Sequence, residues 1–133
     1  MPGRGAGERG TQECMVDVLL VEDDRDIRES MVELLEAEGH VVTPLRNAWE
    51  ALGVLEQPGA PMLVLLDLRM PGMDGLSFLE ALRGRPDGGR YRVILMSADR
   101  AVLKLRQTPG VVAVLEKPFE TSELLEILER HAA

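Results

Sequence analysis

The chain has 133 residues, of which 45% are apolar and 29% are charged, a composition typical of one soluble globular domain and unlike that of a disordered or fibrous protein. Lys and Arg number 15 against 23 Asp and Glu, and the formal net charge of −8 argues against direct binding to nucleic acid. No apolar stretch approaches the roughly 20 residues that a membrane-spanning helix needs, and the single cysteine, Cys14, cannot form an internal disulfide, so we expect a cytoplasmic protein with no membrane contact.

Residues 1–14 are expected to form a flexible tail, and residues 15–133 a single folded domain. The opening stretch is rich in Gly and charge, so it cannot bury enough apolar area to become ordered. It also lacks the apolar centre of a secretory signal. A chain of this length has room for one hydrophobic core and for no second folded unit.

The first apolar run, 16–21, is short and mostly unalternating, as in strands that are covered on both faces. Apolar residues at helical spacing follow, with acidic residues elsewhere around the helix. These apolar residues are Ile27, Met31, Leu34 and Leu35. Gly39 is expected to end this helix, and a weaker apolar run at 40–43 predicts a second strand.

Asn47 is a candidate N-cap for a second helix, which Pro58 and Gly59 would close. A strand is expected at 63–66, where the apolar run is again continuous. A third helix is predicted from the spacing of Leu76, Leu79 and Leu82. The alternation of strands and helices is established by this point in the chain.

Strands at 93–96 and 111–115 flank a short and poorly patterned helix around 99–107. The last helix, about 122–131, carries apolar residues at helical spacing and acids in its first turn. Alternating strands and helices of these lengths imply a parallel sheet with right-handed crossovers and with helices on both faces. The expected fold class is a five-stranded α/β sandwich.

Polar residues follow the strands at the edge of the sheet where α/β proteins bind their ligands. The residues that close the apolar runs are Glu22, Asp23 and Asp24, then Asp67, then Ser97, and finally Glu116, Lys117 and Pro118. Converging carboxylates raise each other's pKa unless a cation lies among them. Mg²⁺ prefers oxygen ligands and typically binds one or two carboxylates together with substrate phosphate oxygens. The pattern therefore predicts an open metal site that takes a phosphate.

Asp67 is the candidate nucleophile of this site. With a metal ion and Lys117 neutralising an incoming phosphoryl group, its carboxylate could attack phosphorus in line and form an aspartyl phosphate. Ser97 would donate a hydrogen bond to a phosphoryl oxygen. Taken singly, the acids after the first strand are ordinary helix caps, Asp67 is an ordinary turn residue and Lys117 an ordinary surface residue. Their joint placement at four strand ends favours the phosphoryl chemistry.

The chain resembles the receiver domain of bacterial response regulators over residues 15–131. The matching motifs are Leu-Leu-Val-Glu-Asp-Asp at 19–24, Leu-Leu-Asp-Leu-Arg-Met-Pro-Gly-Met-Asp-Gly at 65–75, Met-Ser-Ala at 96–98 and Lys-Pro-Phe at 117–119. The resemblance implies a flavodoxin-like, doubly wound sheet with the strand order 2-1-3-4-5, which chemotaxis regulators of this kind also have.

The resemblance also implies a divalent metal site for Mg²⁺ or Mn²⁺. Asp67 and Asp23 match the residues that bind the metal directly, and Glu22 matches the second acid, which reaches the metal through water. Arg69 would offer its backbone carbonyl oxygen as a further ligand.

For the phosphoryl group, Asp67 matches the phosphoacceptor of the family, and Ser97 matches the hydroxyl residue that senses the phosphoryl group. Lys117 matches the lysine that pairs with it, followed by Pro118, which the family usually holds in the cis form. As a receiver, the chain would be a signalling domain that assists its own phosphorylation and dephosphorylation, and not an enzyme in the ordinary sense.

The partners implied by the resemblance are proteins. A sensor histidine kinase or a histidine phosphotransfer protein would supply the phosphoryl group, and phosphorylation would alter binding to a downstream protein target. The chain would act as a monomer or a weak dimer. Neither nucleic acid nor a membrane is an expected direct partner.

Two features of the sequence depart from the family pattern. Val114 stands three residues before Lys117, where receivers often have Tyr or Phe, so the usual aromatic switch is absent. The stretch from Ser97 to Lys117 is also shorter than expected for the family. Both features predict a muted conformational response to phosphorylation.

Two other functions remain open from the sequence. One is a phosphatase of the haloacid dehalogenase type, which also uses a nucleophilic Asp but requires a second Asp two residues later, where this chain has Arg69. The other is a receiver-like interaction module that signals without phosphorylation. Retention of the whole set of acids argues against it, because burying acids that serve no ligand costs stability.

Overall fold

The computed structural model describes residues 16–57, 63–68, 75–85 and 90–131. These residues form a five-stranded sheet in the order β2-β1-β3-β4-β5, with every neighbouring pair of strands parallel. The strands are β1 (Asp17–Val21), β2 (Val41–Leu45), β3 (Leu63–Asp67), β4 (Arg92–Ser97) and β5 (Val111–Glu116). The helices are α2 (Arg25–Ala37), α3 (Ala48–Leu55), α4 (Gly75–Arg83), η3 (Arg100–Gln107) and α5 (Thr121–Arg130). The predicted fold class and strand order are confirmed.

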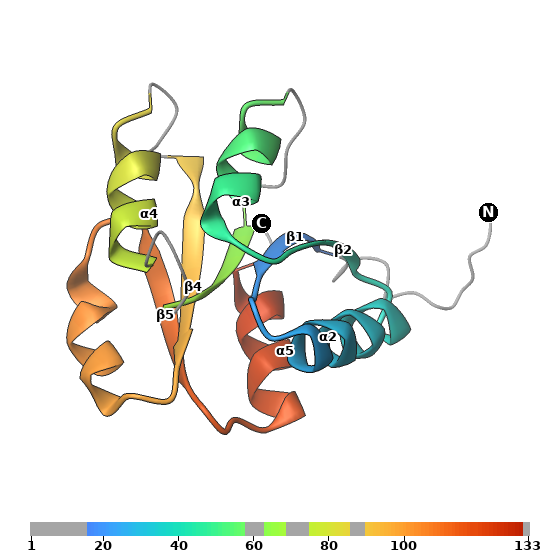
Figure 1. Ribbon diagram of the computed structural model, residues 1–133. Coiled ribbons are helices and arrows are strands. Elements are labelled where there is room, and N and C mark those ends of the chain that lie inside the picture. The colour runs from blue at the N-terminus through green and yellow to red at the C-terminus, as the bar shows by residue number, and fades with distance from the viewer. Residues whose placement is uncertain (1–15, 58–62, 69–74, 86–89, 132–133) are drawn as a thin grey trace.

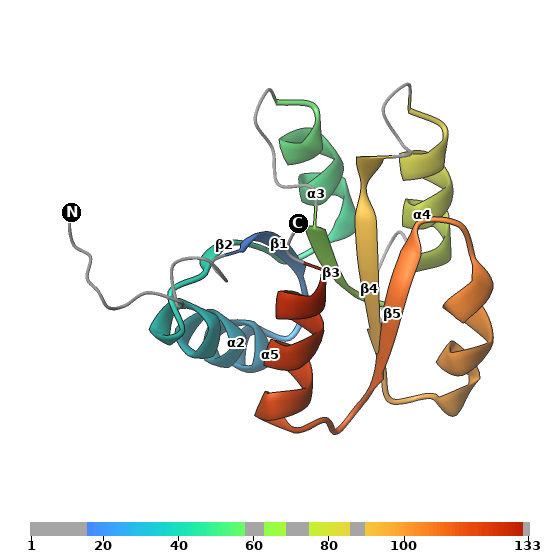
Figure 2. The ribbon, with the colours of Figure 1, turned by 180° about the vertical axis from the view of Figure 1, so that it is seen from behind.

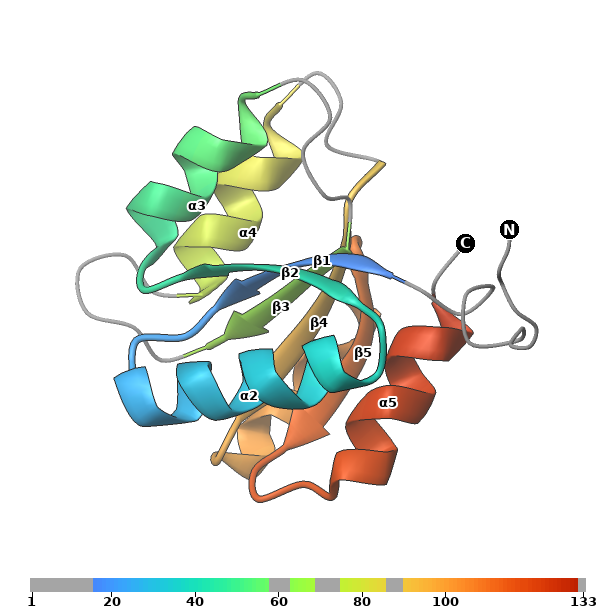
Figure 3. The same ribbon diagram turned by 90° about the vertical axis from the view of Figure 1, so that its right-hand side faces the viewer.

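The sheet lies between two layers of helices, with α3 and α4 on one face and α2 and α5 on the other (Figures 1 and 3). Alternate side chains of a strand point to opposite faces, so Leu19 and Val21 of β1 pack in the core under α3 and α4. Val18 and Leu20 pack in the second core, under α2 and α5. All four are fully buried, which explains why the strands are continuous apolar runs.

The helix starts follow local capping chemistry. The side chain of Asp24 accepts a hydrogen bond from the Ile27 backbone N–H at the start of α2. Asn47 caps α3 in the same way, as predicted, and Glu120 forms a capping box at the start of α5. Gly39 has φ 91°, a left-handed conformation that suits the residue after a helix end. The capping residues therefore set where the helices leave the sheet edge.

The segment between β4 and β5 forms the 3₁₀ helix η3, Arg100–Gln107, where the sequence predicted an ordinary short helix around 99–107. In a 3₁₀ helix, residues three apart lie one above the other, and this brings buried Val102 and half-buried Leu105 onto one side. Figure 2 shows η3 beside β5 at one edge of the sheet. The tighter winding lets so short a segment cover that edge.

The opposite edge of the sheet is β2. The N–H of Val41 donates to the carbonyl oxygen of Val16, and the carbonyl oxygen of Leu45 accepts from the N–H of Glu22. Val41 and Leu45 therefore point these groups towards β1. Because successive residues of a strand point their N–H groups to alternate sides, Pro44 occupies an outward position. Pro44 therefore removes no hydrogen bond from the sheet to which it belongs.

Candidate functional site

Four elements bring the predicted site residues together at the carboxyl end of the sheet. Glu22 directly follows β1, Asp67 ends β3, Ser97 ends β4, and Lys117 directly follows β5. Glu22, Asp67 and Ser97 are buried, with exposed fractions of 1%, 6% and 2%. Polar side chains buried this deeply need partners, because an unpaired buried charge is costly. The strand ends thus converge as the apolar runs predicted.

Lys117 is the cation at the centre of the cluster. Its Nζ lies 3.1 Å from Glu22 Oε1 and 3.3 Å from Asp67 Oδ2, and both contacts are hydrogen bonds. The side chain reaches across the sheet edge from β5, past β4, to the ends of β3 and β1. One ammonium therefore forms ion pairs with two buried carboxylates.

The acids Glu22, Asp23 and Asp67 fit a divalent cation. One carboxylate oxygen from each of the three lies within 4.8 Å of the others, a spacing that one ion can bridge. Asp23 is exposed while the other two are buried, so the cluster opens to solvent on one side. Oxygen ligands with room for water are the donor set that Mg²⁺ prefers. Arg69, the fourth predicted ligand, lies outside the described residues.

The crowding of acids changes the protonation of Glu22. Burial, together with the hydrogen bonding and charge of Asp67, raises its pKa to about 7, although Lys117 acts in the opposite direction. For Lys117, burial lowers the pKa, but the charges of Asp67 and Glu22 outweigh burial and raise it. Lys117 is therefore a permanent cation at neutral pH, and one positive charge does not fully compensate the acids.

Ser97 is oriented by the backbone. Its Oγ accepts a hydrogen bond of 3.0 Å from the N–H of Asp99, and its carbonyl oxygen accepts one of 2.7 Å from the N–H of Lys117. A hydroxyl has one donor and two acceptor positions, so accepting from Asp99 leaves the hydroxyl proton for another acceptor. The Lys117–Pro118 peptide bond is cis, as the resemblance implied.

Arg28 is a site residue that the sequence reasoning missed. Its Nη1 donates to the carbonyl oxygen of Glu22 at 2.8 Å and to that of Asp23 at 3.4 Å, which fixes the turn that presents both acids. Side chains of a helix point towards its N-terminus, so an Arg in the second turn of a helix that follows an acidic loop is the signal that could have revealed it. Asp24 caps α2 and is not part of the acidic cluster.

Val114 lies partly buried in β5 and packs against the core under α3 and α4. It therefore lies on the opposite face of the sheet from the core under α2 and α5. The position where many receivers carry an aromatic ring is thus filled by a small, β-branched side chain.

The sequence of the chain matches a known protein family. A family model described as the response regulator receiver domain matches residues 18–129. The chain belongs to the response regulator receiver domain family. Receiver domains are signalling domains of two-component systems, which interact with histidine kinases, phosphotransfer proteins and downstream effectors.

Individual relatives agree with this assignment. The receiver is 44% identical over 119 residues to the response regulator protein FleR of Pseudomonas aeruginosa, a match that covers 86% of this chain and 24% of FleR. The chain thus spans about a quarter of FleR. It is 28% identical to sporulation initiation phosphotransferase F of Bacillus subtilis, covering 86% of this chain and 91% of that protein.

Among solved structures, the receiver is similar to the response regulator TrrA of Thermotoga maritima in complex with Mg²⁺–BeF. The TM-score is 0.76 at 29% identity, and the match covers 87% of this chain and 98% of that one. Within the part of this chain that the structure describes, no helix is both long and apolar enough to cross a bilayer.

Proposed function

We propose that this receiver accepts a phosphoryl group on Asp67 in a reaction that depends on Mg²⁺ or Mn²⁺. The observation that carries the proposal is the contact of 3.3 Å between the buried Asp67 carboxylate and the ammonium of Lys117. A buried carboxylate at a strand end, paired with a cation and next to two further acids, is the arrangement that an aspartyl phosphate requires.

Each residue has a separate proposed role. Asp67 attacks phosphorus in line, and the leaving group departs on the opposite side with the bonding electron pair. Lys117 pairs with a phosphoryl oxygen, and the Ser97 hydroxyl donates its remaining proton to another. Asp23, Asp67 and the backbone carbonyl of Arg69 would hold the divalent cation directly, and Glu22 would reach it through water. The cation would neutralise charge that develops on the phosphoryl oxygens.

The proposed domain organisation is a tail at 1–14 and a receiver at 15–133, acting in the cytoplasm. Residues 1–15 lie outside the residues that the structure describes. A histidine kinase or a phosphotransfer protein is the proposed donor, and a protein is the proposed target of the phosphorylated state. The similarity to a sporulation phosphotransferase supports this class of donor.

Incubation with acetyl phosphate and Mg²⁺ tests the proposal directly. We expect intact-mass spectrometry to show one added phosphoryl group per chain, and we expect the addition to disappear when EDTA removes the cation. A protein that gains no phosphate under these conditions, or gains it equally in EDTA, would contradict the proposed chemistry.

Substitution of Asp23 by Ala is expected to weaken Mg²⁺ binding by about tenfold or more, because it removes one direct carboxylate contact and a factor of ten needs only about 1.4 kcal/mol. Calorimetric titration measures the affinity. Trp49 fluorescence is a poor probe, since Trp49 lies on α3 with 63% of its surface exposed. The matched control is Asp17→Ala, an exposed acid at the other end of β1; equal affinities in both variants would refute the role of Asp23.

Substitution of Lys117 by Ala is expected to slow phosphoryl uptake by roughly 10- to 100-fold, since a charge-assisted hydrogen bond contributes about 1.5 to 3 kcal/mol. Mg²⁺ affinity should not fall, because the ammonium competes with a cation for Glu22 and Asp67. Rates from mass spectrometry and affinities from calorimetry separate the two effects. Lys104→Ala on η3, an exposed lysine, serves as the control, and an equal rate in both variants would exclude the role.

A further inference from the structure

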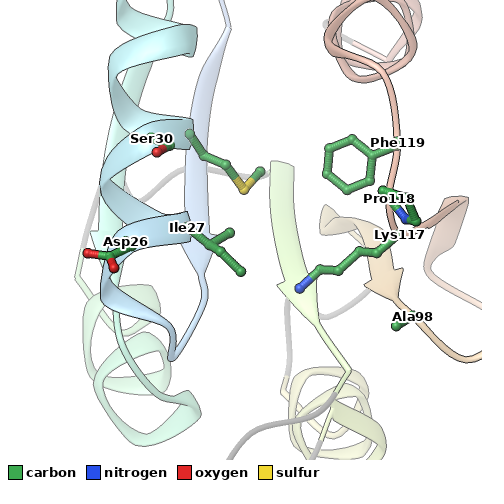
Figure 4. Close-up of a pocket in the computed structure, with 8 residues that line it drawn as sticks. Asp26, Ile27, Ser30, Ala98, Lys117, Pro118 and Phe119 are labelled. Atoms are coloured by element: carbon green, nitrogen blue, oxygen red, sulfur yellow. The ribbon is translucent and has the colours of Figure 1, made fainter.

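An open groove lies directly beside the proposed phosphoacceptor site. Its volume is about 590 Å³, within the range of roughly 300 to 1,000 Å³ that small-molecule sites occupy. One wall is α2, and the other is the segment that links β5 to α5. Figure 4 shows Ile27 pointing from α2 into the gap that Lys117 and Phe119 enter from the opposite side.

The walls of the groove are apolar. Ile27 and Met31 on α2 face Pro118 and Phe119 across the gap. Ile27 is 40% exposed, although it belongs to the apolar stripe of α2 that was expected to be covered. An isoleucine left exposed at this place, opposite an aromatic ring, leaves apolar surface in water that a ligand could cover.

The groove and the acidic cluster share one residue, Lys117. Its side chain lines the groove, while its Nζ contacts Glu22 and Asp67. A phosphate donor in the groove would therefore have its apolar part against the walls and its phosphate beside Lys117, where the divalent cation of the proposed site would offset the three acids. Asp26 also lines the groove. Its negative charge disfavours a ligand that carries a second negative charge along its tail.

We propose that this groove is a binding subsite for the acyl group of small acyl phosphates, so that the receiver takes phosphoryl groups preferentially from donors whose acyl chain is longer than acetyl. The inference rests on the proposed function of Asp67 and names a class of donor for it. The apolar walls bind the hydrocarbon chain, and Lys117, together with the divalent cation of the proposed site, binds the phosphate.

The reaction balances without any further reactant. A carboxylate oxygen of Asp67 forms a bond to phosphorus, and the bond between phosphorus and the acyl oxygen breaks. The acyl group leaves as a carboxylate with the bonding electron pair, and no proton, oxidant or reductant is needed. The products are the aspartyl phosphate and the free fatty acid anion, which departs from the open side of the groove.

A series of donors tests the proposal, namely acetyl, propionyl and butyryl phosphate at equal concentration with Mg²⁺. Covering a methylene completely favours binding by about fourfold, and an open groove covers about half of it, so we expect about a twofold gain for each added methylene. Butyryl phosphate should thus phosphorylate the protein with a second-order rate constant about four times that of acetyl phosphate.

The variant Ile27→Thr should bring this ratio close to one, because it replaces the exposed apolar wall with a hydroxyl. The matched control is Val41→Thr, which changes a similarly exposed aliphatic residue, 49% exposed on β2, outside the groove. The control should keep the fourfold ratio. Both positions are on the surface, so neither substitution endangers folding.

A second readout does not depend on phosphoryl transfer. With Mg²⁺ present, butylphosphonate, which cannot donate its phosphorus group, should shift the NMR signals of the Ile27 methyl groups and of the Phe119 ring, and methylphosphonate at the same concentration should shift them less. The difference should vanish in Ile27→Thr for the Phe119 ring.

Two outcomes would overturn the inference, and a third would overturn the proposed function on which it rests. Equal rates for all three acyl phosphates, with normal phosphorylation of Asp67, would refute the subsite while leaving the proposed function intact. An Ile27→Thr variant impaired only with a phosphorylated histidine protein as donor would assign the groove to a protein partner instead. Absence of transfer from every donor would contradict the proposed function itself, and the phosphonate titration would then decide whether the groove binds alkyl chains.

Discussion

Replacement of Asp67 by Asn is expected to abolish phosphoryl uptake from acetyl phosphate, with no added mass after an incubation that saturates the natural chain. The amide has nearly the same shape as the carboxylate, so the buried end of β3 should remain folded, and its oxygen can still accept from Lys117. It lacks the anionic oxygen that attacks phosphorus. The measurement is intact-mass spectrometry of both proteins.

The control for this substitution is Asp17→Asn, which makes the same chemical change at the exposed start of β1. That variant should gain phosphate with the yield of the natural chain. A phosphate of equal yield on Asp67→Asn would mean that another side chain is the acceptor, and peptide mapping of the phosphorylated variant would then identify it.

Replacement of Glu22 by Gln is expected to raise the free energy of unfolding at pH 8, without divalent cations, by on the order of 3 kcal/mol. In the folded protein, burial and the neighbouring Asp67 raise the pKa of Glu22 from 4.5 to about 7. Forcing this carboxyl to ionise above that pH therefore destabilises the folded state, and a glutamine at the same place cannot ionise. Urea unfolding across pH measures the difference.

The pH range follows from the same two values. Between pH 4.5 and about 7, the folded chain retains the proton of Glu22 while the unfolded chain has lost it, so stability from this group falls as the pH rises. Below pH 4.5 both states are protonated, and the variant and the natural chain should be equally stable. Added Mg²⁺ should restore the natural chain at pH 8. Parallel stability curves for the two proteins from pH 4.5 to 8 would rule out the raised pKa.

The strand ends could be predicted from the sequence because burial imposes a simple pattern. Continuous apolar runs mark strands covered on both faces, and in a parallel sheet all the strands end at one edge. Asp67 and Ser97 end consecutive strands, so they were expected to lie close together if those two strands were neighbours in the sheet. The ion pairs of Lys117 with Glu22 and Asp67 agree with the strand order that the resemblance implied.

Other features depend on contacts that a linear pattern does not encode. Arg28 has the spacing of an ordinary exposed helix residue, yet it folds back to two backbone carbonyls of the acidic turn. Ile27 has the spacing of a core residue, yet it stands where the facing segment leaves a groove. Similarly, the residues of η3 fit an α-helix poorly, but their spacing does not predict the 3₁₀ helix that forms there, with Val102 in the same core as residues of β4 and β5.

Pro44 affects whether a strand of another molecule can pair with the β2 edge of the sheet. A parallel sheet whose last strand is uncovered can recruit a strand from another chain through the N–H groups on its outer side, which is a route to filaments and aggregates. On β2 the outward N–H groups would belong to Val42 and to residue 44, and proline has none. An incoming strand would thus leave one of its carbonyls without a donor at the fourth position of this five-residue edge. Since the bonds of β2 to β1 use only the inward groups, this proline protects against polymerisation at no cost to the stability of its own sheet.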